Sequence, residues 1–404
     1  MQRQSRNSSE FKARQPAAPG STDPTLRIAL VLERFDSNAG GLERWTSLFA
    51  EALLARGHEV HVAASEFALH RPPCVPHHFA LNPSAWRQAH SIAAAVRQLD
   101  VDIVHDMGYG WSGDVFHPHA SSRVLNLSRQ VADMPVAARL RRFISPGFRY
   151  RRHELRATER RQMKAAKYVI AVSQLVKTEL TKAYEFAGNR IVVVPNGVDT
   201  VRFSPDQRAT HRKESRHALG FTDETVFLAV AHNFRLKGVD TTLEALTPLR
   251  GDSRKPRLIV AGDGDIAEYR RQADRLGVGE LISFLGNVDA IERVYAAADV
   301  LVHPTRRDAC SLATLEAIAT GLPVITSCED GAAERLRSGD EALVISHPGD
   351  VRELAVAMQA LLNHDMRLAM SKATQRVRPE LAFDHNVARI VEIYRKVLDQ
   401  RTAL

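Results

Sequence analysis

Strand-like and helix-like patterns alternate along most of this chain, and the alternation stops once and then begins again. In the first half, short apolar and β-branched runs predict strands at 26–32, 58–64, 101–105, 115–117, 168–172 and 191–194. In the second half, equivalent runs lie at 226–231, 257–261, 282–285, 300–303, 323–327 and 343–346. Apolar residues at helical spacing fill the intervals, as in the segment from Leu42 to Gly57. This pattern predicts an α/β protein with two doubly wound domains.

The polar residues 205–220 lie between the two halves and are expected to connect the domains. We therefore expect an N-terminal domain over 26–204 and a C-terminal domain over 205–380. Residues 1–25 are polar and contain Pro, Ser and Gly, which predicts a disordered tail. Because ligands of doubly wound domains bind beyond the carboxyl ends of the strands, the expected site is a cleft between the domains.

Several protein classes are disfavoured by composition. Hydrophobic residues make up 44% of the chain and charged residues 25%, and no run of 18 apolar residues is long enough to cross a bilayer. The first 25 residues lack the apolar segment of a secretory signal. The three cysteines, Cys74, Cys310 and Cys328, are odd in number and widely spaced, which argues against a disulfide framework. A reducing, cytoplasmic location is expected.

Two carboxylates stand out in the stretch TRRDACSLATLEAIATGLPVI, which begins at Thr305. Asp308 precedes a helical run, and Glu316 lies eight positions later, inside that run. A carboxylate on a loop and another one or two turns into the helix can point into one crevice and accept hydrogen bonds from ligand hydroxyls. From these residues alone, two solvated acids beside a buried helix are an equally good interpretation.

Other positions suit an anionic ligand. Gly40-Gly41 follows a predicted strand and precedes a helix, where backbone amides and the helix dipole attract a diphosphate, although a plain turn is the alternative. Arg235 and Lys237 follow another strand and precede Gly238. Two cations at such a position can meet phosphate oxygens, and a charged surface loop is the alternative. The chain has no G-x-G-x-x-G motif here, so a nicotinamide cofactor is not indicated.

The sequence predicts no metal site. Neither of two Asp-x-Asp pairs has further hard ligands nearby; they are Asp100-Val101-Asp102 and Asp263-Gly264-Asp265. His117 and His119 share one face of an extended segment, but the sequence offers no third ligand for them.

The positive charge is concentrated in residues 123–164, which contain twelve Lys or Arg and three acids, whereas the whole chain carries +8. Arginines beside aromatic residues suit an anionic membrane surface. Arginines beside aromatic residues suit binding to single-stranded RNA equally well. A third interpretation is an arginine-rich helix that only faces solvent. We predict membrane contact and no nucleic-acid partner, with Phe143, Phe148 and Tyr150 beside the arginines at the surface. The predicted membrane-binding residues are Arg141, Arg142, Arg149, Arg151 and Arg152.

Several motifs together are similar to family 4 glycosyltransferases of the GT-B fold. They are AGGLERW, PNGVDTVRF, FRLKG, AGDGD, ISFLGNV, the run AAADVLVHPTRRDACSLATLEAIATGLPVI and a C-terminal helical tail. Within the family, the chain most resembles bacterial enzymes that glucosylate the heptose of the lipopolysaccharide inner core, and FRYRRHELRATERRQMK matches them in position and character. The resemblance implies two Rossmann-like domains facing across a cleft. It also implies that helix 381–404 packs back on the N-terminal domain.

The resemblance assigns expected roles to individual residues. The family's E-x7-E motif falls on Asp308 and Glu316, which would hold the donor's sugar and ribose hydroxyls, respectively. Arg235, Lys237 and the backbone amides around Cys310, Ser311 and Leu312 would bind the diphosphate or sugar, and His119 would lie beside the sugar. The chain departs from the family pattern where Asp308 replaces Glu, Ser311 replaces Gly and His232 replaces Arg. These departures bear on donor choice.

The expected activity is that of a retaining, metal-independent hexosyltransferase that uses no cofactor, with Lys237, Asp308 and His119 as the catalytic residues. It would transfer a sugar, most simply glucose from UDP-glucose, to a lipid-linked saccharide such as the lipopolysaccharide inner core. The expected location is peripheral, on the inner face of the cell membrane. The alternatives are a nucleotide-sugar epimerase of the same fold, which would need further acid/base carboxylates, and a non-catalytic membrane protein that binds nucleotide sugars.

Overall fold

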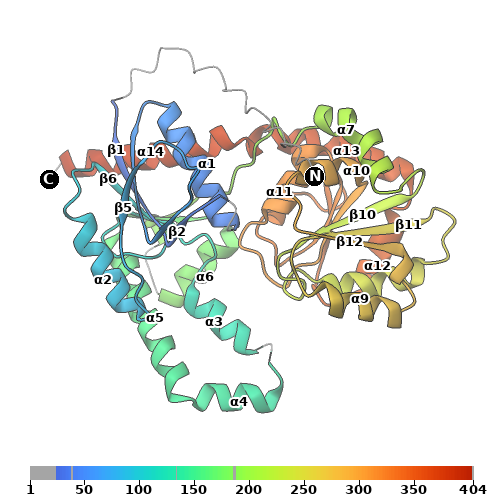
Figure 1. The fold of residues 1–404 in the computed structure, drawn as a ribbon, viewed down its shortest axis with the longest axis horizontal. Helices are drawn as coiled ribbons and strands as arrows, with labels where there is room; N and C mark the ends of the chain where they lie inside the picture. The colour runs from blue at the N-terminus through green and yellow to red at the C-terminus, as the bar shows by residue number, and fades with distance from the viewer. Residues whose placement is uncertain (1–23, 38–39, 133, 185–187, 403–404) are drawn as a thin grey trace, which may run out of the picture.

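The computed structural model describes residues 24–37, 40–132, 134–184 and 188–402, which form two α/β domains side by side (Figure 1). Each domain is built around a parallel sheet. Most of the predicted tail, residues 1–23, lies outside the described residues. The predicted fold class is confirmed.

The N-terminal sheet has seven strands in the order β5-β3-β1-β6-β7-β8-β9. All described pairs are parallel, and β1 lies centrally between β3 and β6. The edge strand β5 was not predicted, because Pro76 and two histidines mask its apolar pattern. The strands are β1 (Arg27–Val31), β3 (Glu59–Ala64), β5 (Val75–His78), β6 (Ile103–Asp106), β7 (Val115–Phe116), β8 (Tyr168–Ala171) and β9 (Ile191–Val193). A separate pair joins β2 (Arg34–Phe35) to β4 (Glu66–Phe67).

The C-terminal sheet has six strands in the order β12-β11-β10-β13-β14-β15, again all parallel. The apolar runs predicted from the sequence form this sheet. The strands are β10 (Thr225–Val230), β11 (Pro256–Ala261), β12 (Ile282–Gly286), β13 (Val300–His303), β14 (Val324–Ser327) and β15 (Ala342–Ile345). Helices that cover it include α8 (Val239–Leu246), α9 (Ile266–Arg275), α10 (Ile291–Ala297), α11 (Leu312–Thr320), α12 (Val351–Ala360) and α13 (His364–Val377).

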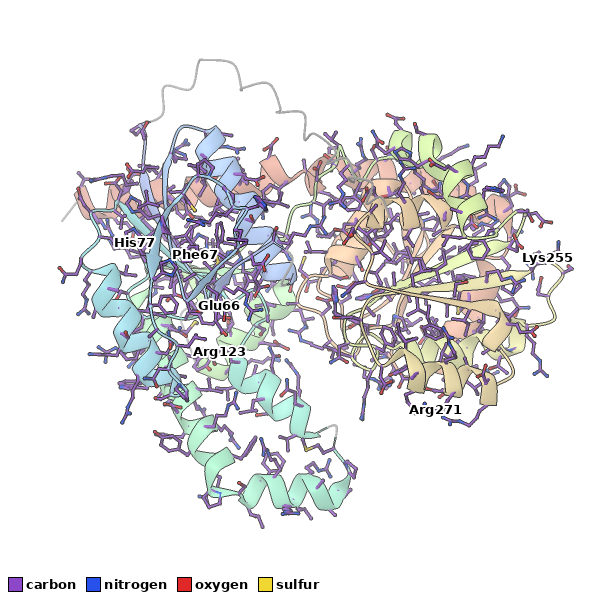
Figure 2. All side chains as sticks on the ribbon, viewed as in Figure 1. Glu66, Phe67, His77, Arg123, Lys255 and Arg271 are labelled. Atoms are coloured by element: carbon purple, nitrogen blue, oxygen red, sulfur yellow. The ribbon has the colours of Figure 1, made fainter. Side chains whose placement is uncertain are left out.

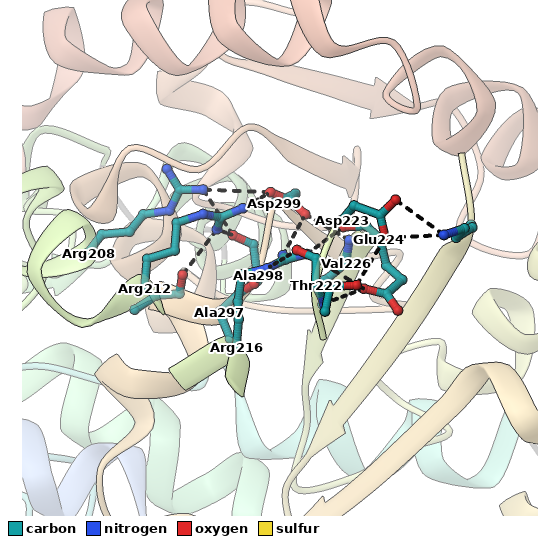
Figure 3. Close-up of polar contacts among 12 residues, drawn as sticks. Arg208, Arg212, Arg216, Thr222, Asp223, Glu224, Val226, Ala297, Ala298 and Asp299 are labelled. Atoms are coloured by element: carbon teal, nitrogen blue, oxygen red, sulfur yellow. Dashed lines mark hydrogen bonds and ion pairs between the residues drawn. The ribbon is translucent and has the colours of Figure 1, made fainter. Parts of the chain in front are cut away.

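Residues 205–220, expected to connect the domains, mostly form helix α7 (Pro205–Ala218), which packs against α10 of the C-terminal domain. Ser204 caps this helix by accepting a hydrogen bond from the Gln207 amide at 3.2 Å. Three arginines at four-residue spacing then face α10, where they donate to carbonyls at its C-terminal end and pair with Asp299 (Figure 3). They are Arg208, Arg212 and Arg216. In the sequence the segment resembles a polar linker, because the residues that its arginines contact are more than 80 positions away along the chain.

The last helix, α14 (Phe383–Thr402), returns to the N-terminal domain (Figure 1). Its buried side chains, including Val387, Ile390 and Tyr394, belong to the same core as Ile28 and Leu30 of β1. The helix therefore fastens the end of the chain to the first sheet.

The N-terminal domain also carries helices α1 (Gly41–Ala55), α2 (Ala85–Val96) and α6 (Gln174–Tyr184). The basic segment forms α3 (Arg123–Ala132), α4 (Val136–Ile144) and α5 (Pro146–Ala165), which extend away from the sheet as an arm (Figure 1). Within the described ranges, no helix combines the length and apolar character needed to cross a membrane.

Candidate functional site

Two loops at the carboxyl end of the C-terminal sheet are held against each other. One follows β10 and contains Lys237; the other follows the neighbouring strand β13 and contains Asp308. Thr305 Oγ1 donates to the Leu236 carbonyl at 3.1 Å. Gly238 has φ 71°, and a Cβ atom there would lie 2.2 Å from the Pro304 carbonyl oxygen, so only glycine allows this approach.

Lys237 and Asp308 form an ion pair at this junction, with their side chains 21% and 17% exposed. His303 Nε2 lies 3.3 Å from the same carboxylate oxygen. Burial alone would raise the pKa of Asp308, but the positive charge of Lys237 and the hydrogen bond with His303 hold it well below its ordinary value. Asp308 is therefore an ionised acceptor beside a cation.

Asp330 holds the loop between Asp308 and α11 in place. Its Oδ1 accepts from the Ser311 amide at 3.2 Å, and its Oδ2 accepts from Thr314 Oγ1 at 2.7 Å. Ser311 caps α11 by accepting from the Thr314 amide at 3.2 Å. The departure from glycine at this position thus provides a helix cap. Burial, together with the charge of Asp308, raises the pKa of Asp330.

Glu316 lies on α11 and is 8% exposed. Tyr295 of α10 donates its hydroxyl to Glu316 Oε2 at 3.0 Å. Burial raises the pKa of Glu316, while the charge of Arg44 on α1 opposes that shift. The sequence pattern did not identify Tyr295 or Arg44, because their proximity to Glu316 depends on how the helices and the two domains pack.

The N-terminal domain reaches the same place through the start of α1. A Cβ atom on Gly41 would lie 3.8 Å from Leu312 Cδ1, so the first residue of α1 faces the first residue of α11. Gly40 immediately precedes α1. The Cys310 carbonyl, one residue before the Ser311 cap, accepts from Asn196 Nδ2 at 3.1 Å. The helix starts predicted to receive a diphosphate are thus neighbours across the domains.

Two further contacts join the domains. Arg307 donates to Glu179 Oε2 of α6 at 2.6 Å, and both side chains are largely buried. Glu334 accepts from the Gln174 and Leu175 amides at 2.7 and 2.6 Å, which satisfies the N-terminus of α6. Arg307 follows β13, Glu334 lies in the segment after β14, and α6 follows β8, so the carboxyl ends of the two sheets face each other.

His119 lies after β7 and packs against Trp45 of α1, with ring centroids 4.4 Å apart. Burial lowers its pKa to about 3, so His119 is neutral near pH 7. Arg235 lies exposed in the Lys237 loop, and its carbonyl accepts from Arg306 Nε at 3.0 Å. His232, in the same loop, pairs with Asp263 at 2.8 Å.

The five arginines predicted to bind membrane lie on α4 and α5 of the arm (Figure 1), and all are exposed. Phe143 and Tyr150 are 36% and 66% exposed. Phe148 is instead 3% exposed, so its predicted surface position was wrong. It packs edge-on against Phe143 with centroids 5.6 Å apart and fastens α4 to α5.

Among the described residues, no three side chains of the kinds that bind metals gather at one place. Asp100 and Asp102 pair with Arg27 instead. Asp265 caps α9 by accepting from the Glu268 amide at 3.0 Å.

Comparison with known proteins identifies both domains. Residues 39–202 match the model for Glycosyltransferase Family 4, and residues 224–364 match that for Glycosyl transferases group 1. The chain is 26% identical over 356 residues to the lipopolysaccharide glucosyltransferase WaaG of Escherichia coli (strain K12). The aligned region covers 82% of this chain and 89% of that protein.

Solved structures agree with this result. The crystal structure of WaaG, a glycosyltransferase involved in lipopolysaccharide biosynthesis, superposes with a TM-score of 0.77 at 23% identity and covers 91% of this chain and 99% of that one. Anabaena HepE in complex with UDP-glucose superposes with a TM-score of 0.66 at 19% identity, covering 94% of this chain and 100% of that one. The chain is therefore a glycosyltransferase of the GT-B fold, in which a family 4 domain precedes a group 1 domain.

Proposed function

We propose that this enzyme is a retaining, metal-independent glucosyltransferase that transfers glucose from UDP-glucose to a lipid-linked saccharide such as the lipopolysaccharide inner core. The observation that carries the donor site is the Lys237–Asp308 pair. Asp308 lies shortly before α11, whose first residue faces α1 of the N-terminal domain. The named activity of the Escherichia coli relative and the UDP-glucose complex of the Anabaena neighbour support the choice of donor.

Glu316 is proposed to hold the ribose of the donor. A carboxylate can accept hydrogen bonds from both ribose hydroxyls. Tyr295 contacts only Oε2 of this side chain, which leaves acceptor capacity for the ligand. Because burial raises the pKa of Glu316, ligand hydroxyls that donate to the ionised form would lower it again.

The donor's diphosphate would lie against Lys237 and Arg235. The amides around Cys310, Ser311 and Leu312 and the turn at Gly40-Gly41 would complete its surroundings, because helix N-termini attract phosphate. Lys237 would then exchange its contact with Asp308 for the phosphate oxygens. Asp308 would be released to accept from sugar hydroxyls, with His119 on the opposite side.

The proposed reaction needs no metal. The bond between glucose C1 and the phosphate oxygen breaks, and its electron pair leaves with UDP. The acceptor oxygen bonds to C1 on the same face, and its proton passes to the departing phosphate. Lys237 and the helix amides would stabilise the negative charge that grows on UDP, which is electrostatic catalysis.

The arm is proposed to contact the inner face of the membrane, where a lipid-linked acceptor is confined. Helix α4 has no buried residue among those described, and one side of it is apolar: Val136, Leu140, Phe143 and Ile144. Exposed arginines flank this side. An amphipathic helix with this composition suits an anionic interface.

A transfer assay tests the proposal. Purified enzyme is incubated with UDP-glucose, EDTA and a heptose-terminated lipopolysaccharide core in vesicles. We expect α-linked glucose in the product, identified by the coupling constant of its anomeric proton. A β-linked product, loss of activity in EDTA, or hydrolysis without transfer would contradict the proposal. UDP-galactose, GDP-mannose and ADP-glucose in parallel reactions define the donor.

A further inference from the structure

Three buried ring nitrogens beside the proposed sugar site have no hydrogen-bond partner within the described part of the chain. They are Trp45 Nε1, His117 Nε2 and His119 Nε2. Trp45 is 2% exposed and His117 is fully buried. The rings form one cluster, since the His117 and His119 centroids are 3.8 Å apart and the Trp45 and His117 centroids are 5.3 Å apart. Buried polar groups in native proteins usually have a hydrogen-bond partner, so these three nitrogens have capacity to bond a ligand.

A hydrogen-bonded chain behind the cluster determines which nitrogen of His117 carries the proton. The Tyr394 hydroxyl bonds His105 Nδ1, and His105 Nε2 lies 3.1 Å from His117 Nδ1. In the described residues, the Tyr394 hydroxyl has no other hydrogen-bond partner. If His105 donated to Tyr394, the buried hydroxyl hydrogen would lack an acceptor, so Tyr394 donates to His105.

The direction of the first bond sets the others. His105 accepts at Nδ1 and therefore carries its proton on Nε2, which donates to His117 Nδ1. His117 must then carry its own proton on Nε2, the nitrogen without a partner. Burial lowers the pKa of His105 and of His117, which keeps both rings neutral.

We propose that His117 Nε2–H and Trp45 Nε1–H donate hydrogen bonds to sugar oxygens in the cleft, and that Tyr394 and His105 are positioning residues that fix His117 as a donor. This inference rests on the proposed function, because it deepens the same site. Location supports a sugar: Trp45 lies one turn after Gly41, which faces Leu312, and His117 follows β7 directly. Uncharged donors suit hydroxyl and ring oxygens of a neutral sugar. The oxygens could belong to the donor or to the acceptor.

Trp45 gives a direct probe of the proposal. The chain has three tryptophans, so a proton–nitrogen NMR spectrum contains three indole signals, and the Trp45→Phe variant identifies one of them. UDP, UDP-glucose and the soluble acceptor saccharide are added separately, with binding measured by calorimetry. We expect the Trp45 signal to move with UDP-glucose and not with UDP. Movement with the acceptor saccharide alone would also support the proposal and identify that sugar as the source.

Binding of UDP-glucose and of acceptor without movement of the Trp45 signal would overturn this inference and leave the proposed function standing. Absence of UDP-glucose binding in calorimetry would instead overturn both. The two results are therefore distinguishable.

The His117 assignment is tested with nitrogen NMR and matched variants. In enzyme labelled with ¹⁵N-histidine, we expect the Nε2–H tautomer at His117, and loss of tautomer control in Tyr394→Phe. A Gln side chain places its donor near the position of Nε2, whereas Asn places it near Nδ1. His117→Gln should retain kcat/KM within about threefold, and His117→Asn should lose about tenfold, the value of one hydrogen bond. The Nδ1–H tautomer in wild-type enzyme, or equal activity of the two variants when both are folded, would refute the assignment.

Discussion

Lys237 Nζ donates to Asp308 Oδ2 across two loops that follow neighbouring strands. The cation proposed to bind phosphate is thus held by the anion proposed to bind sugar until a donor separates them. This relationship leads to distinct expectations for the two residues.

Lys237→Ala is expected to lower kcat about 100- to 1,000-fold, as removal of one preorganised donor does in other enzymes. KM for the donor should change less, because negative charge on the diphosphate grows as the glycosidic bond breaks. Steady-state kinetics with varied UDP-glucose check this. Lys255→Ala is the control, since Lys255 lies at the outer end of the C-terminal domain (Figure 2). Unchanged kcat in Lys237→Ala would show that Lys237 does not act on the leaving group.

Asp308→Asn is expected to destabilise the ligand-free enzyme near neutral pH. The folded-state pKa of Asp308 lies below its ordinary value, so the charged form stabilises the fold above the unfolded pKa of about 3.9, and that contribution is lost as the pH falls further. Urea unfolding from about pH 7 to about pH 2 should therefore show a difference from wild type that is constant above about pH 4 and shrinks below it. A difference independent of pH would exclude this role. Asp308→Glu keeps the charge and should retain activity with altered donor selectivity.

Glu316→Gln is expected to raise the melting temperature of the ligand-free enzyme near neutral pH. Burial raises the folded-state pKa of Glu316, so its ionised form destabilises the fold above the unfolded pKa, and the effect vanishes below it. The variant should bind UDP-glucose more weakly, because each ribose hydrogen bond to a charged group contributes about 1.5 to 3 kcal/mol. Calorimetry and thermal unfolding check both effects.

Glu341→Gln is the matched control for a buried glutamate. Glu341 is 1% exposed and pairs with Arg376 away from the site. This variant should lose stability and bind the donor normally. If Glu316→Gln behaves in the same way, Glu316 is a structural residue.

The arm is expected to attach the enzyme to anionic vesicles at low salt. Each engaged arginine contributes about 1 kcal/mol, and the attraction decays within a Debye length of about 10 Å at 0.1 M salt. Co-sedimentation should decline when five arginines become serine: Arg141, Arg142, Arg149, Arg151 and Arg152. A control with the same charge change lies on the C-terminal domain: Arg250, Arg254, Arg270, Arg271 and Arg275. Equal loss in both variants, or binding to single-stranded RNA in preference to vesicles, would contradict the arm's proposed role.

Lys237 and Asp308 lie on loops that follow apolar runs predicted as strands, and the structure brings their side chains together. The two residues are 71 positions apart, but carboxyl ends of adjacent parallel strands meet at one sheet edge. The role of Ser311 as a helix cap could also have been predicted from the sequence, because a serine directly before an apolar helical run is a usual N-cap.

Features that depend on distant partners were not predictable. Helix α7 has a polar sequence, and the role of its arginines becomes visible only when the fold places them beside Asp299. Tyr295 and Arg44 flank Glu316 because α10 and α1 pack near α11, which no local pattern encodes. The Tyr394–His105 bond spans 289 residues and requires α14 to return to the first sheet.

The central claim is that the donor lies between Lys237, Asp308 and Glu316. Thermal unfolding in the presence of nucleotide sugars tests this claim most directly. UDP-glucose at 100 times its dissociation constant should stabilise wild-type enzyme by about 2.7 kcal/mol. At that concentration, Glu316→Ala should be stabilised much less, and Glu341→Gln should respond like wild type. No stabilisation of wild-type enzyme by any UDP-, GDP- or ADP-sugar, or equal stabilisation of Glu316→Ala, would contradict the account.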